Sequence, residues 1–167
     1  DNKKHRGALE LEVPFYVPKF SDNKISKFYS SPRTISHMMV EEFMLAANIA
    51  TAEICLKYNL PSLFRVHPKP DMLKINNLTS FLRSRRINAK LDDGNSVKQL
   101  SELAEFVGDR KDKEIMHMQI LQSLSLATYE AKVSEHFALG YKAYSHFTSP
   151  IRRYPDLIVH RTIKKLI

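Results

Sequence analysis

The stretch "HFTSPIRRYPDLIVHR", residues 146–161, decides how the rest of the sequence is interpreted. It places Arg152 and Arg153 between Pro150 and Pro155, directly ahead of an apolar helical pattern. Proline fixes its own φ angle and disfavours helical geometry in the residue before it. The stretch is therefore predicted to be a stiff loop that leads into a helix, with Pro155 near the first helical position.

An arginine held in a stiff loop is suited to binding a phosphate. Its guanidinium presents a planar fork of N–H donors and keeps its charge at working pH. Thr148 and Ser149 add hydroxyl groups a few residues earlier. The alternative is that one of the two arginines pairs with Asp156 and has a structural role. The residues alone leave phosphate binding and structural pairing both open.

The composition indicates a single globular domain with a basic surface. The chain has 167 residues, of which 43% are hydrophobic, and its net charge is +8. A basic excess favours a polyanionic partner, either nucleic acid or an anionic membrane surface. No apolar run reaches the roughly 18 residues that span a bilayer, so no membrane segment is expected.

A single cysteine, Cys55, excludes an internal disulfide framework and a multi-cysteine zinc site. Its apolar surroundings predict a buried thiol, and we expect a cytoplasmic protein. The chain opens on Asp1 and stops inside an unfinished helical pattern. We therefore expect it to be a piece of a larger protein.

Hydrophobic periodicity predicts a mixture of helices and short strands. Strands are expected within 6–20, at 63–67 and at 136–144. Helices are expected at 36–58, 70–85, 96–107, 112–130 and from 155 onward. The helix at 36–58 has apolar residues almost all round, which predicts a buried helix, and Ser36 is its expected N-cap.

Polar side chains in that helix need an explanation. Glu41, Glu42 and Asn48 fall within the apolar pattern, and buried carboxylates require partners. Alternatively, Glu41 or Glu42 reaches solvent near the first turn, where the helix dipole favours a negative charge.

No metal site is predicted from the aspartates of this chain. Asp92 and Asp93 lie in an apparent surface turn without a third ligand. Asp109 and Asp112 lie among basic residues, which suits a solvated charged loop.

Five segments together resemble the ribonuclease II and ribonuclease R family, and the form of the opening stretch is closer to ribonuclease R. They are RGALELE (6–12), VEEFMLAANIATA (40–52), LFRVHPKP (63–70), HFALGYKAYS (136–145) and the opening stretch itself. The resemblance implies that residues 1–167 are the C-terminal part of an RNB catalytic domain. The implied fold is mixed α/β (α+β), with a central sheet flanked by helices around an RNA channel.

The resemblance also implies a reaction. Members of this family hydrolyse single-stranded RNA processively from its 3′ end and release nucleoside 5′-monophosphates, using two Mg²⁺ ions held by aspartates. Those aspartates and the flanking OB-fold domains are expected upstream or outside of this chain, so the fragment alone is expected to be inactive. A monomer is expected. The alternatives are a non-catalytic RNA-binding homologue and, third, a helical DNA-binding module.

Site residues are carried over by position. Arg152 matches the family's catalytic arginine at the scissile phosphate, and Glu42 matches a glutamate near the RNA 3′ end. Supporting RNA contacts are assigned to Arg6, Thr148, Ser149, Arg153 and Tyr154. Leu11 stands where some members have a base-stacking phenylalanine, which puts that stacking in doubt. Phe15 and Phe20 are the candidates to replace it.

Overall fold

The computed structural model describes the chain except for residues 1–7, 12, 14, 31, 92–96 and 167. The described part is a mixed α+β structure, as predicted. Its helices are α2 (Ile35–Lys57), α3 (Met72–Ser84), α4 (Val97–Val107), α5 (Lys113–Ser123) and α6 (Tyr154–Lys164). Its strands are β1 (Tyr16–Ser21), β2 (Lys24–Ser30), β3 (Phe64–Val66) and β4 (Thr128–Glu130). In the described residues the strands form two separate antiparallel pairs, β1 with β2 and β3 with β4, so the single central sheet that was expected is not present among them.

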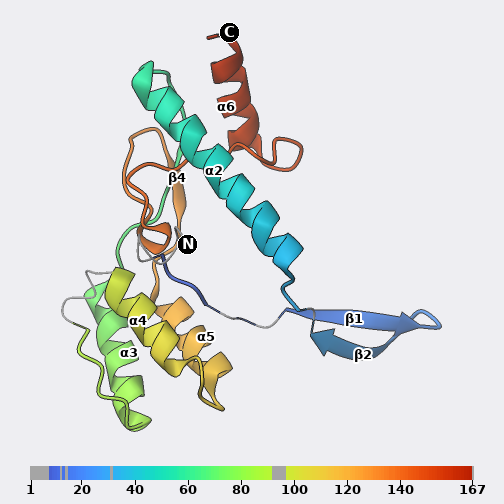
Figure 1. Cartoon of the computed structure of the whole chain (residues 1–167), viewed down its shortest axis with the longest axis vertical. Helices are drawn as coiled ribbons and strands as arrows, with labels where there is room; N and C mark the ends of the chain where they lie inside the picture. Colours follow the sequence, from blue (N-terminus) through green and yellow to red (C-terminus); the bar gives the residue numbers. More distant parts are fainter. Residues whose placement is uncertain (1–7, 12, 14, 31, 92–96, 167) are drawn as a thin grey trace.

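Two hydrophobic cores hold the molecule together. The first lies among α3, α4 and α5, which form a three-helix group at the lower end of Figure 1, and it includes Leu82, Leu100 and Met116. The second joins α2, β3 and α6 through Ala52, Phe64 and Val159. Cys55 also belongs to the second core and is 1% exposed, which confirms the prediction of a buried thiol.

The long helix α2 begins earlier than predicted. Thr34 is its N-cap, with extended backbone angles and a side-chain oxygen that accepts a hydrogen bond from the His37 N–H. The His37 ring in turn accepts from the Thr34 N–H at 3.2 Å, which completes a capping box. Ser36 as the N-cap is therefore wrong, because Thr34 satisfies these donors two residues earlier.

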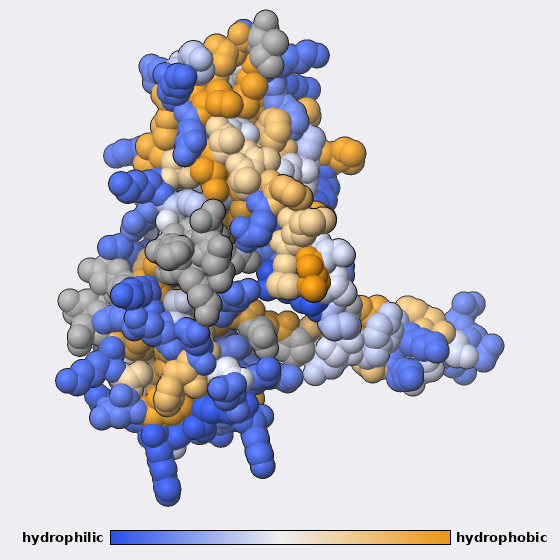
Figure 2. All heavy atoms as spheres, viewed as in Figure 1, coloured by the Kyte–Doolittle hydropathy of each residue, from blue (hydrophilic) through white to orange (hydrophobic). Residues whose placement is uncertain are grey.

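The prediction that α2 is buried all round is also wrong for the described residues. Ala52 and Cys55 are enclosed, whereas Met39 and Phe43 are 54% and 68% exposed. Figure 2 shows hydrophobic side chains along this helix. An apolar pattern indicates a surface that avoids water, but it does not say which elements cover that surface.

A β-hairpin follows the N-terminal segment and projects from the molecule (Figure 1). Asp22 and Asn23 have φ angles of 50° and 59°, which is the geometry of a two-residue type I′ turn. The predicted strands within 6–20 correspond to β1, but β2 was missed. The signal for β2 was the Asp-Asn pair between two partly alternating runs.

Tertiary pairing overrides two further predictions. The helix expected over 112–130 ends at Ser123, because Thr128–Glu130 pair with β3 as β4. The strand expected at 136–144 contains instead a 3₁₀ turn, Phe137–Leu139, and Gly140 at φ 67°. A left-handed residue at this position ends an extended run, and only glycine adopts it without strain. The predictions for β3, α3, α4 and α6 are confirmed.

Candidate functional site

The loop that carries Arg152 is fixed at its start by the strand β3. Ser145 is fully buried, and its hydroxyl donates to the Leu63 carbonyl at 2.7 Å. The Arg65 N–H donates to the Tyr144 carbonyl at 2.8 Å. The loop ends at α6, which begins at Tyr154 with Pro155 in its first positions, as predicted.

A buried aspartate at the end of the loop binds two residues of the loop. Asp156 is 0% exposed, and its Oδ2 accepts from the Ser149 N–H at 2.8 Å. The same oxygen accepts from Arg153 Nε at 3.2 Å and Nη2 at 2.8 Å. Structural pairing with Asp156, one of the two open interpretations, therefore belongs to Arg153.

Arg152 lies on the outer side of the same turn. Its backbone N–H donates to the Ser149 carbonyl at 3.3 Å, while its side chain is exposed. Its neighbours Ile151 and Tyr154 are exposed as well. Within the part of the chain that the structure describes, the Arg152 guanidinium has no ion pair. In this loop Arg153 therefore has a structural role, while the Arg152 side chain is exposed and can contact a ligand.

Asn48 joins α2 to this loop. It is 3% exposed, and its amide nitrogen donates to the Tyr144 hydroxyl at 2.8 Å. Its amide oxygen accepts from the Phe147 N–H at 2.8 Å. The sequence singled out Asn48 because a buried amide needs partners, and these are the partners. The helix that carries Glu42 is thereby tied to the loop that carries Arg152.

Replacing Asn48 by leucine is expected to destabilise the protein by about 2–3 kcal/mol, because it strands the Phe147 N–H and the Tyr144 hydroxyl in a buried place. Thermal unfolding of the full-length protein measures the effect. Asn76→Leu, at an exposed amide on α3, is the matched control and should change little. Equal melting temperatures for the two variants would contradict the anchoring role.

The remaining predicted site residues are distributed around these elements. Glu42 is half-buried on α2, and Thr148 and Ser149 are half-buried in the loop. Leu11 packs beside the three-helix core and lines a pocket with Leu45 and Leu139. Phe15 and Phe20 are 69% and 63% exposed, and Phe20 lies on β1 of the projecting hairpin. Arg6 lies outside the described residues.

A cluster of histidines and tyrosines packs beside the start of the loop, and no sequence pattern predicted it. A hydrogen bond of 2.7 Å between the Tyr129 hydroxyl and His146 Nδ1 joins the loop to β4. Burial and, to a smaller extent, the positive charge of Arg153 lower the pKa of His146 to about 4. Burial also lowers the pKa of His136 to about 3, with a contribution from His67 nearby. These imidazoles are therefore neutral in the folded protein.

Neutral, half-buried histidines make the stability of the protein depend on pH. In the unfolded chain histidine titrates near its ordinary pKa of about 6.5. Stability is therefore full above pH 6.5 and is lost as the pH falls toward 4 and then 3. His136 contributes a loss of about 2 kcal/mol between pH 7 and pH 5. His136→Phe should lessen the fall in melting temperature between these pH values, and an unchanged fall would contradict this assignment.

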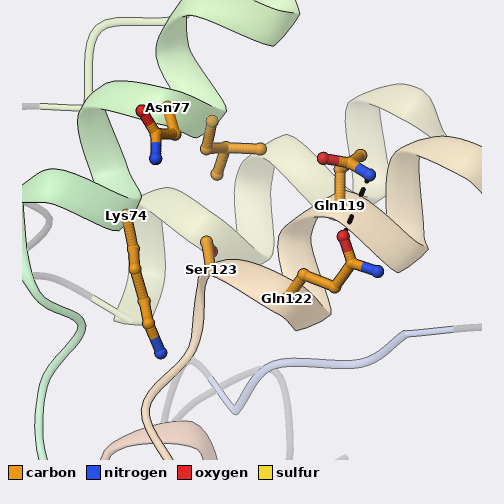
Figure 3. Close-up of a pocket in the computed structure, with 6 residues that line it drawn as sticks. Lys74, Asn77, Gln119, Gln122 and Ser123 are labelled. Carbon is orange, nitrogen blue, oxygen red and sulfur yellow. Dashed lines mark hydrogen bonds between the residues drawn. The ribbon is translucent and has the colours of Figure 1, made fainter.

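A polar pocket between α3 and α5 lies apart from the loop. Figure 3 shows Lys74 and Asn77 on one side and Gln119, Gln122 and Ser123 on the other. The Lys74 ammonium donates to the Leu124 carbonyl at 2.9 Å, and Gln119 donates to Gln122 at 3.1 Å. Lys74 and the two glutamines therefore already have partners within the chain, and none of the pocket residues was predicted as a site residue.

Within the described ranges, no group of three or more histidine, cysteine, aspartate or glutamate residues is placed to hold a metal ion. Asp112 accepts from Arg110 at 2.8 Å, and this bond lowers the pKa of its carboxyl group. Asp92 and Asp93 lie outside the described residues. No described helix is both long enough and apolar enough to cross a bilayer.

The fold and the arginine-bearing loop define a known class of domain. The RNB domain family matches residues 1–167, and the chain therefore belongs to this family. The curated relatives are called Ribonuclease R. The protein from Escherichia coli is 38% identical over 170 residues, covering 99% of this chain and 20% of the relative. The protein from Thermotoga maritima is 41% identical over 164 residues, covering 97% of this chain and 23% of the relative. The chain spans about a fifth of the length of these relatives.

Solved structures agree with this assignment. Mycoplasma genitalium RNase R in complex with double-stranded RNA has a TM-score of 0.90 and 25% identity, covering 98% of this chain and 29% of that chain. A structure of yeast Ssd1, described as a pseudonuclease, has a TM-score of 0.69 and 26% identity. It covers 81% of this chain and 17% of that chain. The RNB fold expected from the five sequence segments is thus confirmed.

Proposed function

We propose that this chain is the C-terminal part of an RNB catalytic domain, and that the protein carrying it is a processive 3′→5′ exoribonuclease. Its substrate is single-stranded RNA and its products are nucleoside 5′-monophosphates. The relatives named Ribonuclease R support the reaction class, and solved RNase R complexes contain double-stranded or ribose-methylated single-stranded RNA. The observation that carries the proposal is the exposed side chain of Arg152, on a loop that Asp156 holds through bonds to the Ser149 N–H and to Arg153.

The residues of this chain have distinct proposed roles. Arg152 donates to the scissile phosphate and stabilises the charge that develops in the transition state. Glu42 positions the terminal nucleotides at the 3′ end. Thr148, Ser149 and Tyr154 line the approach of the RNA to Arg152. Arg153 holds the loop through Asp156, and its direct contact with RNA stays a prediction.

The proposed reaction uses two Mg²⁺ ions, which would activate a water molecule and stabilise the leaving oxygen. The described residues offer no group of three ligands for such ions, so the ligands are proposed to lie elsewhere in the protein. This chain supplies the arginine side of the site, and alone it is expected to be inactive. We further propose that the protein is cytoplasmic and monomeric.

A second candidate function is RNA binding without catalysis. The similarity to yeast Ssd1, described as a pseudonuclease, favours keeping this alternative. The exposed Arg152 favours the enzyme, because a scaffold has no need of a cation aimed at a reacting phosphate.

A comparison of linear and circular RNA of the same sequence tests the proposed function. The full-length protein should shorten the linear RNA and leave the circle intact, because only the linear molecule has a 3′ end. Cleavage of both at equal rates would mean an endonuclease. An RNA that is bound and left intact in both forms would mean the non-catalytic alternative.

A further inference from the structure

Three charged side chains from different parts of the chain meet beside the start of α2. Arg33 lies directly before the N-cap Thr34, so the capping box fixes the backbone from which its side chain extends. Its Nη1 donates to Glu10 Oε1 at 2.9 Å. Its Nη2 donates to Glu41 Oε2. One guanidinium fork therefore links the N-terminal segment to the second turn of α2.

Both carboxylates are next to residues of the candidate site. Glu10 precedes Leu11, which stands at the predicted base-contact position, and Glu41 precedes Glu42, which is predicted to hold the RNA 3′ end. The N-terminal segment is also bound one residue before Glu10, where the Leu9 N–H donates to the Ala138 carbonyl at 2.9 Å. The Arg33 ion pair adds a second contact at Glu10, directly before Leu11, which itself packs against the three-helix core.

The ion pairs also border a pocket. Its apolar wall comes from Leu9, Leu11, Leu45 and Leu139, and its polar wall comes from the linked charges. The lining includes Glu10 and Leu11 from the N-terminal segment and Glu41 and Leu45 from α2. A planar fork that bonds to Glu10 and Glu41 at once constrains their separation more than a point charge can.

Arg33 contributes charge as well as geometry. The positive charge of Arg33 lies against the carboxylates of Glu10 and Glu41, next to Glu42 in the sequence and near the proposed position of an RNA chain. Loss of this charge would strengthen the repulsion between these carboxylates and the phosphates of the RNA. The side chains of Arg33, Glu10 and Glu41 are 41%, 55% and 38% exposed, so their ion pairs contribute little to folding stability. Loss of Arg33 should therefore change the site and leave the fold intact.

We propose that Arg33 is a positioning residue that sets the spacing between Leu11 and the turn of α2 that carries Glu42, and so shapes the seat of the RNA 3′ end. This inference rests on the proposed exoribonuclease function. Arg33 acts through Glu10 and Glu41 and does not itself touch the reacting atoms.

Four variants of the full-length protein separate geometry from charge. Arg33→Met removes both, and Arg33→Lys keeps the charge but loses the fork. Glu10→Gln with Glu41→Gln removes the two negative charges, and the triple variant combines these with Arg33→Met. Arg83→Met is the matched control, since Arg83 is exposed at the end of α3 and has no ion pair among the described residues. KM, kcat, melting temperature and the length of the shortest RNA product are measured for each.

Arg33→Met should raise KM about tenfold and lengthen the shortest product, with kcat and melting temperature close to those of the unaltered protein. The triple variant should recover part of the KM, because repulsion is gone, but not the product length. Arg33→Lys should lie between Arg33→Met and the unaltered protein. A purely structural residue would lower the melting temperature and leave the product length unchanged.

If the Arg33→Met and Arg83→Met proteins have the same KM and the same shortest product, the inference is wrong, but the proposed function still holds. An unaltered protein that degrades no RNA would instead overturn the proposed function, and the inference with it. The two failures are therefore distinguishable.

Discussion

Replacing Arg152 by alanine in the full-length protein is expected to slow RNA hydrolysis by about 10²–10³-fold while the affinity for RNA changes little. The side chain is exposed on a stiff turn and has no ion pair among the described residues, so its charge is available to a substrate. A donor aimed at a reacting phosphate gains most where negative charge develops, which is in the transition state. The affinity of a protein for a long RNA is the sum of many phosphate contacts, so the loss of one contact changes that affinity little.

Single-turnover kinetics separate these effects, because they report the chemical step apart from product release. Arg161→Ala is the matched control, since Arg161 is exposed on α6 a few residues further along the same segment. Arg152→Lys should also be slow, because an ammonium lacks the planar fork of donors. A single-turnover rate that Arg152→Ala leaves unchanged would remove Arg152 from the reaction.

Asp156→Asn is expected to have the largest effect on stability, a loss of about 3 kcal/mol. The carboxylate is fully buried, and its Oδ2 accepts from the Ser149 N–H and from two nitrogens of Arg153. Asparagine keeps one acceptor but loses the charge that pairs with Arg153. Its amide nitrogen would stand where Oδ1 accepts no hydrogen bond from the described residues. Because the same bonds hold the turn, hydrolysis should slow even at temperatures where the protein stays folded.

Melting temperature and single-turnover rate of the full-length protein test both parts of this prediction. Asp71→Asn makes the same chemical change at an exposed N-cap of α3, where asparagine also accepts from the Leu73 N–H. It should therefore have little effect. If Asp156→Asn proves as stable and as fast as Asp71→Asn, Asp156 does not hold the loop.

The sequence predicted the local elements best where side-chain pattern alone decides them. The α6 start followed from Pro155, and the loop followed from Pro150 and Pro155 together. It failed where partners distant in sequence decide the structure. Thr128–Glu130 continue an apolar run that suits a helix, yet they pair with β3, some 60 residues earlier. Periodicity cannot register a partner at that separation.

The candidate site divides in the same way. The sequence allowed two roles for the arginine pair, and the structure assigns the structural role to Arg153, because its Nη2 lies 2.8 Å from Asp156 Oδ2. Asn48 was recognisable as a buried amide, but its bonds to Tyr144 and Phe147 depend on a fold that brings together residues almost 100 positions apart. The Arg33 fork had no sequence signal, since arginine and glutamate are ordinary surface residues.

Release of mononucleotides from RNA labelled on its 3′-terminal nucleotide tests the central claim most directly. The full-length protein is incubated with this single-stranded RNA and Mg²⁺, and the products are separated by chromatography. We predict that the label appears at once as a nucleoside 5′-monophosphate, while the rest of the RNA shortens behind it. Binding of the RNA with no release of labelled mononucleotide would contradict the claim, and this domain would then belong to a non-catalytic RNA-binding protein.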